Sequence, residues 1–238
     1  MTSISKKYGK VRVLQDVSLN VAPGEVVGLF GRDGAGKTVC FECIMGLVKL
    51  DAGHILLNGK DITCLTVDRR GPLGLSYLSQ ETSIFRGMTT SENINAVLEQ
   101  CEPDPGLRMQ RLDILLSEFN IDYVRDTPAP RLSGGERRRC EIARAMATSP
   151  SFMLLDEPFA GVDPLVVISI EEVIVRLKND GIGILISDQN VHAMLDIIDR
   201  AYVLHMGQII FDGSRDDMIR DENVHQIYLG DQFKNYKQ

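Results

Sequence analysis

A glycine-rich segment has the residue types and spacing of a phosphate-binding loop. Residues 31–38 read Gly-Arg-Asp-Gly-Ala-Gly-Lys-Thr, which fits the pattern G-x-x-x-x-G-K-[ST], and an apolar run precedes them. In such a loop main-chain N–H groups surround the β-phosphate of a nucleotide, the lysine reaches the β- and γ-phosphates, and the threonine hydroxyl is offered to Mg²⁺. The predicted nucleotide contacts here are Gly31, Gly34, Ala35, Gly36, Lys37 and Thr38.

A second segment suited to anions lies further along the chain. Residues 132–136 read Leu-Ser-Gly-Gly-Glu, and Ser133 and Glu136 have the spacing of a capping box, so Ser133 is expected to begin a helix. Gly134 and Gly135 let an anion approach the backbone at the N-terminus of that helix. One chain therefore carries two phosphate sites that must be reconciled.

Two adjacent carboxylates follow an apolar run. Residues 152–155 predict a buried strand, and Asp156 and Glu157 come at its carboxyl end, where α/β sheets place ligands. Asp156 suits the holding of Mg²⁺, directly or through water, and Glu157 is placed to polarise an attacking water molecule. A loop of ordinary acidic residues would not explain why Pro158 and Asp163 follow in this order.

The elements around these residues predict an α/β fold with a mainly parallel, covered sheet, because short apolar runs alternate with amphipathic segments. Strands are expected at 26–30, 74–78, 152–155 and 182–186, and helices at 39–47, 107–119, 133–147, 164–178 and 217–229. An edge strand or hairpin is expected at 11–21, and hairpins at 54–59 and 201–211. Tyr8 comes so early that there is scarcely room for a full first strand before it, which an upstream start or a shortened edge strand would explain.

These elements suggest a single domain over residues 1–238. Residues 1–87 and 148–238 are expected to form the core, with an antiparallel β portion near the N-terminus, and residues 88–147 an inserted helical subdomain. The length suits one large α/β unit. The three arginines at 137–139 are expected to lie on a solvated helix face, and a local contact point for a partner is the alternative.

Composition narrows the function classes. With a net charge of −7 the chain should have no bulk affinity for nucleic acid or anionic lipid. No apolar run is long enough to cross a bilayer and no secretory signal stands at the start, so a cytosolic location is expected, with any membrane role supplied through a partner. The five cysteines suit a reducing compartment, and Cys40 and Cys43 are expected to be buried thiols rather than zinc ligands.

Three further features accompany these motifs: Ala160-Gly161-Val162-Asp163 after the carboxylates, Gln80 after the strand that ends at Leu78, and the early aromatic Tyr8, which alone could equally be a surface tyrosine. With them, the chain resembles the ATP-binding subunits of ABC transporters over essentially its full length. The resemblance implies an ATPase with the P-loop NTPase fold that uses ATP and Mg²⁺. It also implies that Tyr8 stacks on adenine, that Gln80 senses Mg²⁺ and the membrane subunits, and that Asp163 belongs to the nucleotide site.

The resemblance also reconciles the two phosphate sites. In this family two subunits pack head to tail, and the signature helix of one caps the γ-phosphate held by the other. Ser133, Gly134 and Gly135 are therefore expected to act across an ATP-bound homodimer, and a monomer should not turn over ATP. Two transmembrane permease subunits are the implied partners, which would place the chain peripherally on the cytoplasmic face of the inner membrane.

Within the family the chain is most similar to the ATPases of lipopolysaccharide export. That similarity rests on residues 77–86, 132–139, 156–164 and the tail at 228–233. It implies that Phe85 and Arg86 lie where the membrane subunits dock, although ordinary partial burial is an alternative for Phe85. The ATPases of branched-chain amino acid importers share much of the pattern, so the transported substrate stays open, and no direct lipid contact by this chain is expected.

One position departs from the family pattern. A histidine is expected two residues after Ser187, but this chain has Gln189 there. A glutamine amide can donate a hydrogen bond to the γ-phosphate but cannot take up a proton in the relevant pH range. Because Glu157 is retained, we expect slowed hydrolysis with ATP binding intact, and a switch with weak hydrolysis is the alternative. His192, three residues on, is expected to be a surface or packing residue.

Overall fold

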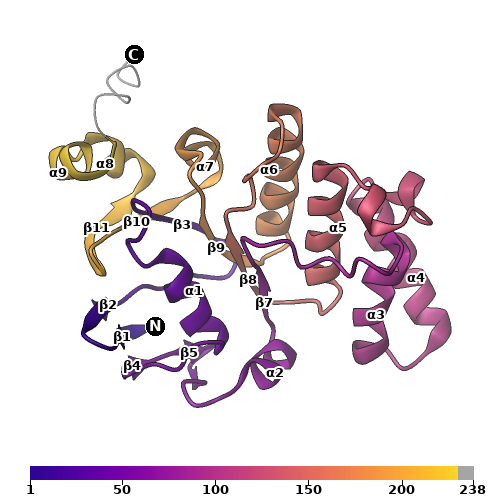
Figure 1. Ribbon diagram of the computed structural model, residues 1–238, viewed down its shortest axis with the longest axis horizontal. Helices are drawn as coiled ribbons and strands as arrows, with labels where there is room; N and C mark the ends of the chain where they lie inside the picture. The colour runs from indigo at the N-terminus through magenta and orange to yellow at the C-terminus, as the bar shows by residue number, and fades with distance from the viewer. Residues whose placement is uncertain (230–238) are drawn as a thin grey trace.

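A six-stranded sheet forms the centre of this computed structural model, which describes residues 1–229 (Figure 1). Its strands, in spatial order, are β11 (Gln208–Ser214), β10 (Arg200–His205), β3 (Val26–Phe30), β9 (Gly183–Ser187), β8 (Phe152–Asp156) and β7 (Leu75–Leu78). Neighbours run parallel from β10 to β7, and β11 pairs antiparallel with β10. The mainly parallel sheet agrees with the sequence prediction. Residues 230–233 of the tail used for the family resemblance lie outside the described residues.

The central strand β3 is buried on both faces because helices or strands cover each side of the sheet. Val26 and Phe30 pack into one core, whereas Val27 and Leu29 pack into another. This division follows from the period of two in a strand, which sends successive side chains to opposite faces. It also explains why residues 26–30 read as a continuous apolar run instead of an alternating one.

The N-terminal strands form a separate antiparallel sheet. In it β1 (Thr2–Tyr8) lies between β2 (Val11–Val17) and β4 (Ala52–His54). The expectation that there is scarcely room for a full first strand before Tyr8 is wrong, since β1 begins at Thr2 and pairs with β2 from Ile4 to Tyr8. The predicted hairpin at 54–59 is short, with β5 (Leu56–Leu57) and β6 (Lys60–Asp61) joined by two residues of positive φ.

Helices flank the sheet on both sides. The core helices are α1 (Lys37–Met45), α2 (Val67–Arg70), α6 (Pro164–Asn179), α7 (Val191–Ile197), α8 (Arg215–Arg220) and α9 (Glu222–Val224), with a last turn at His225–Leu229. The helices α3 (Thr90–Cys101), α4 (Pro105–Glu118) and α5 (Gly134–Met146) gather at one end of the molecule, on the right in Figure 1. Short 3-10 turns lie at Gly71–Leu73, Asp122–Val124 and Ala129–Arg131. None of the helices in residues 1–229 is both long and apolar enough to span a bilayer.

Candidate functional site

A polar cavity of about 400 Å³ lies where the parallel strands end. Its lining residues come from β2, from the start of α1 and from the loops that follow β3, β7, β8 and β9: Val13, Asp33, Gly34, Gly36, Lys37, Thr38, Val39, Gln80, Glu157 and Gln189. Carboxyl ends of parallel strands meet at one edge of a sheet, so loops far apart in sequence converge there. The cavity thus gathers the glycine-rich loop, the Gln80 position, one of the paired carboxylates and Gln189.

The glycine-rich loop is closely packed from behind. A Cβ on Gly31 would lie 2.4 Å from the carbonyl oxygen of Leu204, and one on Gly36 would lie 2.9 Å from that of Val13. Both glycines have positive φ, 153° and 108°, so larger residues would be strained as well as crowded. The loop leads into α1, and the main-chain N–H groups of its first turn, which begins at Lys37, have no partner within the helix.

Lys37 is held inside the loop. Its side chain is only 7% exposed, and Nζ donates to the carbonyl oxygens of Gly31 at 2.7 Å and Arg32 at 3.4 Å. Burial of an ammonium is unfavourable unless it is paired. Two neutral carbonyls compensate the charge only in part, so an anion in the cavity would be a better partner for this group.

Asp156 lies behind the cavity wall and is fully buried. Its two carboxylate oxygens accept hydrogen bonds from Ser187 Oγ at 2.7 Å and from Tyr77 Oη at 3.4 Å. Neither donor was singled out from the sequence. Ser187 could have been found, because it ends the strand that pairs with β8 opposite Asp156.

Glu157 reaches the cavity and is held by two amides. Gln80 Nε2 donates to Oε2 at 2.9 Å, and Gln189 Nε2 donates to Oε1 at 3.4 Å. Burial raises the pKa of Glu157 above its ordinary value, and the hydrogen bond from Gln189 opposes that rise. The backbone φ of Glu157 is +48°, a conformation uncommon for a residue with a side chain. The side chains of Gln80 and Gln189, both predicted from the sequence, therefore meet at the carboxylate of Glu157, which was also predicted.

Gln189 also reaches the glycine-rich loop, where Nε2 lies 3.4 Å from Asp33 Oδ1. The amide therefore lies between two carboxylates from different loops. The neighbouring Asp188, which the sequence did not single out, is 3% exposed and accepts from the N–H groups of Phe159 and Asn190. His192 lies exposed on α7, as expected.

The signature segment begins α5 as predicted, with a complete capping box between Ser133 and Glu136. Ser133 Oγ donates to Glu136 Oε2 at 2.8 Å, so the hydroxyl is engaged within the chain. Gly135 is buried against Val166 of α6, whereas Gly134 is exposed. None of the described residues that line the cavity comes from this segment.

Six other predicted positions also lie outside the cavity lining: Gly31 and Ala35 of the glycine-rich loop, Tyr8, Asp163, Phe85 and Arg86. Tyr8 is 47% exposed at the end of β1, with Lys6 Nζ 5.2 Å from its ring centroid. Asp163 caps α6 through the N–H groups of Leu165 and Val166. Phe85 and Arg86 lie on the surface, and the Arg144 guanidinium sits 4.7 Å above the Phe85 ring, which is 46% exposed.

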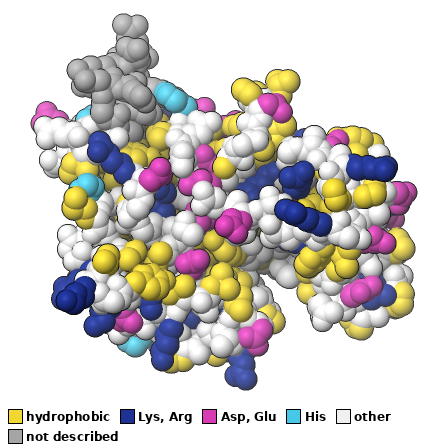
Figure 2. Space-filling view, viewed as in Figure 1, with side chains coloured by type: hydrophobic (Ala, Val, Ile, Leu, Met, Phe, Trp, Pro, Cys, Tyr) yellow, Lys and Arg dark blue, Asp and Glu magenta, His cyan; other side chains and the backbone are white. Residues whose placement is uncertain are grey.

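The three arginines at 137–139 do not form a solvated face. Arg138 is 7% exposed, and its guanidinium donates hydrogen bonds to main-chain carbonyl oxygens, including those of Glu157 and Pro158. Arg137 and Arg139 are partly exposed. The prediction was wrong because consecutive helical residues point about 100° apart, so three in a row cannot share one face. Figure 2 shows Lys and Arg side chains gathered over the part of the molecule that contains α5, despite the net charge of −7.

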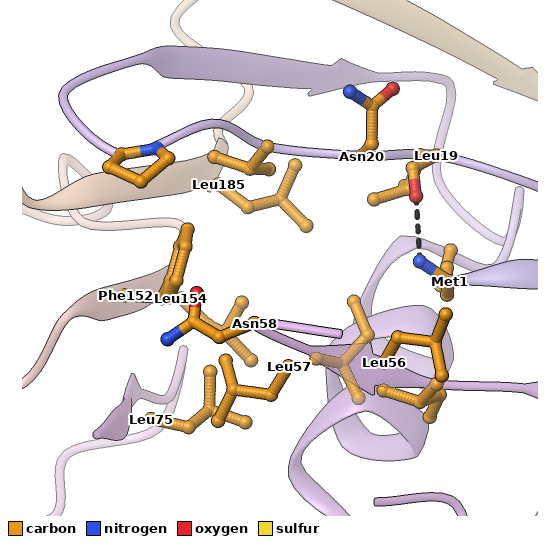
Figure 3. A pocket seen from close by; sticks show the side chains of 14 residues that line it. Met1, Leu19, Asn20, Leu56, Leu57, Asn58, Leu75, Phe152, Leu154 and Leu185 are labelled. Atoms are coloured by element: carbon orange, nitrogen blue, oxygen red, sulfur yellow. Dashed lines mark hydrogen bonds between the residues drawn. The ribbon is translucent and has the colours of Figure 1, made fainter. Parts of the chain in front are cut away.

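A second, apolar cavity of about 240 Å³ lies between the N-terminal strands and the sheet (Figure 3). Leucine side chains such as Leu19, Leu75 and Leu185 line it, and Asn20 and Asn58 are its polar side chains. Without charged side chains it is unsuited to phosphate.

The thiols of Cys40 and Cys43 are buried on α1 as predicted, and burial raises the pKa of Cys43 to about 11. Among the described residues no group of three His, Cys, Asp or Glu is placed to hold a metal.

Comparison with known proteins identifies the family. The family model described as ABC transporter matches residues 14–160, which include the glycine-rich loop, the signature segment and the paired carboxylates. The chain belongs to the ABC transporter family. It is an ATP-binding subunit of that family and an ATPase.

Relatives cover nearly the whole chain. The lipopolysaccharide export system ATP-binding protein LptB of Acidithiobacillus ferridurans is 51% identical over 98% of this chain and 96% of that protein. The protein of the same name from Escherichia coli strain K12 is 45% identical over 98% and 97%. Among solved structures, the ADP conformation of MJ1267, an ATP-binding cassette of an ABC transporter, has a TM-score of 0.85 and 29% identity over 97% of each chain. The predicted P-loop NTPase fold, with its antiparallel N-terminal strands, is thereby confirmed.

Proposed function

We propose that this chain is the ATPase subunit that powers extraction of lipopolysaccharide from the inner membrane toward the outer membrane. One observation carries the proposal: 45–51% identity, over about 98% of the chain, to proteins named as lipopolysaccharide export ATP-binding proteins. The alternative of a branched-chain amino acid importer rests on shared motifs alone. A switch with weak hydrolysis is favoured only by Gln189.

Phosphate binding in this proposal depends on the glycine-rich loop. Lys37 moves from the carbonyls of Gly31 and Arg32 onto phosphate, and the main-chain N–H groups from Gly34 to Thr38 surround it. Asp33 adds a negative charge at the mouth, which weakens affinity for phosphate slightly.

The donor set also fits Mg²⁺, which prefers oxygen ligands and keeps part of its water shell. Thr38 and Gln80 offer oxygens into the same cavity, and the buried Asp156 would hold the ion through water. When bound, the ion neutralises phosphate charge and orients the phosphates. In this scheme Glu157 accepts a hydrogen bond from the attacking water, and the amides of Gln80 and Gln189 keep its carboxylate aimed into the cavity.

A homodimer completes the site in this proposal. Support comes from the exposed positions of Ser133 and Gly134. Neither residue lines the cavity that holds the glycine-rich loop of its own chain, so both are free to contact a nucleotide in another subunit. A bound phosphate would also compete with Glu136 for the Ser133 hydroxyl. Asp163 and Tyr8 are assigned to the same composite site on the family resemblance.

The docking surface for two transmembrane subunits is assigned to Phe85 and Arg86. An aromatic ring 46% exposed beside an exposed arginine is the type of residue pair that anchors interfaces. Through these partners the chain would sit peripherally on the cytoplasmic face of the inner membrane, without touching lipid or nucleic acid itself.

The test is affinity capture of the tagged chain from detergent-solubilised membranes, with partners identified by mass spectrometry. Two multi-span subunits and a periplasmic lipopolysaccharide-binding bridge are expected. Capture with a periplasmic amino-acid-binding protein instead would refute the export assignment. The matched control is Phe85→Ala with Arg86→Ala, which should lose the partners while keeping ATP binding.

A further inference from the structure

Arg138 connects residues 156–158, which carry the paired carboxylates and are called here the carboxylate loop, to the loop that carries Gln80. Its guanidinium is buried on α5 and takes no part in the site proposed above. Four of its hydrogen bonds go to main-chain carbonyl oxygens: Ser79 (3.1 Å), Asp156 (3.3 Å), Glu157 (3.1 Å) and Pro158 (3.2 Å). Guanidinium suits this arrangement because its five N–H groups diverge in a rigid plane.

The peptide groups that Arg138 binds set the direction of the Glu157 side chain. Glu157 has a positive φ of 48°, and its own N–H donates to Ser187 O at 2.7 Å. Such a backbone conformation persists only where the surroundings enforce it. On one side the enforcing contact is β9, and on the other it is Arg138.

Glu141 completes the arrangement one turn along α5. Its side chain is also buried, and Oε2 lies 3.2 Å from Arg138 Nη1. The other oxygen, Oε1, accepts the main-chain N–H of Ser83 at 2.8 Å. The pair therefore holds the segment that contains Gln80 at two points, Ser79 and Ser83.

We propose that Arg138 and Glu141 act as positioning residues that fix the Glu157 carboxylate relative to Gln80. Neither side chain lines the cavity or bonds to the glycine-rich loop, so they act on the rate of hydrolysis and not on ATP affinity. This inference rests on the proposed role of Glu157 in hydrolysis. The Gln80–Glu157 hydrogen bond of 2.9 Å is the contact that the pair maintains.

The test compares Arg138→Gln with the double variant Arg138→Gln/Glu141→Gln, by steady-state ATPase kinetics and thermal unfolding of the dimer-competent chain. Arg138→Gln is expected to lower kcat by about 10- to 100-fold, since misplacement of a reacting group by about 1 Å has effects of that size. KM for ATP should stay within about threefold, because Lys37 and the glycine-rich loop are untouched.

The double variant separates positioning from stability. Arg138→Gln removes the ion-pair partner of the buried Glu141 carboxylate and should lower Tm, whereas removing both charges should restore much of it. The kcat of the double variant should remain low, because the guanidinium group that binds the four carbonyl oxygens is still missing. The matched control is Arg111→Gln on α4, whose guanidinium donates to Ala147 O and Ser149 Oγ, and which should keep kcat within about twofold.

Two kinds of result would overturn the inference: one shows that the pair is only structural, and the other shows that Glu157 has no role in hydrolysis. If kcat recovers together with Tm in the double variant, or stays at the wild-type value in folded Arg138→Gln, the pair is only structural. If Glu157→Gln itself retains wild-type turnover, the proposed role of Glu157 fails and the positioning role fails with it. If Glu157→Gln loses turnover while Arg138→Gln keeps full turnover, the positioning role is refuted and the proposed role of Glu157 stands.

Discussion

The adjacent glycines of the signature segment face different neighbours, and alanine at each position tests the two roles separately. A Cβ on Gly135 would lie 2.5 and 2.8 Å from the two γ-carbons of Val166. Because a β-branched side chain has little freedom at χ1, rotation of Val166 cannot relieve both contacts. A Cβ on Gly134 would meet the carbonyl oxygen of Gly161 at 3.7 Å, an ordinary contact.

These distances set the expected magnitudes. Overpacking at Gly135 costs about 1–3 kcal/mol, and replacing glycine by alanine in a helix returns roughly 0.5–1 kcal/mol. With the middle of each range, the net loss of unfolding free energy for Gly135→Ala is about 1 kcal/mol, and Tm should fall by roughly 2–4 °C for a domain of this size. Gly134→Ala should leave Tm unchanged or slightly raised. It should nevertheless lower ATPase activity, since its methyl group stands at the proposed contact with the other subunit's nucleotide.

The assay is thermal unfolding followed by circular dichroism, with ATPase rates measured on the same preparations. Val166→Ala combined with Gly135→Ala should regain the lost Tm, because the smaller side chain frees the space, and Val166→Ala alone is the control. A wild-type Tm for Gly135→Ala, or an equal loss of Tm in Gly134→Ala, would refute the packing argument. Full ATPase activity in Gly134→Ala would contradict the contact across the dimer.

Three further predictions concern the carboxylate and its amides. Glu157→Gln should lower kcat by about 100-fold or more and accumulate an ATP-bound dimer on size-exclusion chromatography, and a monomer peak with ATP present would count against it. Gln189→His, assayed with the membrane partners, should raise turnover roughly tenfold, the worth of one charge-assisted hydrogen bond of about 1.5 kcal/mol, whereas equal rates would show that the amide suffices. Activity needs ionised Glu157, whose pKa is raised by burial, so kcat should fall on acidification at a higher pH than for an ordinary glutamate. Gln189→Ala removes the hydrogen bond that opposes this rise, so its acid limb should move to still higher pH, and an unmoved limb would show that Gln189 does not interact with Glu157.

Where sequence reasoning failed, the cause was tertiary. The run of arginines at 137–139 looked like a polar surface, because the sequence shows charge but not what packs on a helix. Arg138 is buried since the carboxylate loop and the Gln80 loop both bring unpaired carbonyls to α5. The spacing of Arg138, Glu141 and Arg144 at intervals of three was the available signal, because it marks one helix face.

The two signature glycines show the same limit. Their sequence signal is identical, and only the structure shows that Gly135 is required by Val166 within the chain while Gly134 is exposed. Tyr77, which donates to Asp156, likewise gave little signal, because tyrosine is a common residue within strands.

The fold class, the phosphate-binding loop, the capped signature helix and the family could be predicted from the sequence, because these depend on local spacing: glycines at fixed intervals, a capping box, apolar runs that end in carboxylates. Which side chains share the cavity, and which hold them there, depends on how distant segments pack together. Gln80, Glu157 and Gln189 are far apart in the chain and meet because parallel strands end at one edge of the sheet. Arg138 became part of that assembly because burial and pairing are properties of the packed molecule, which local spacing does not encode.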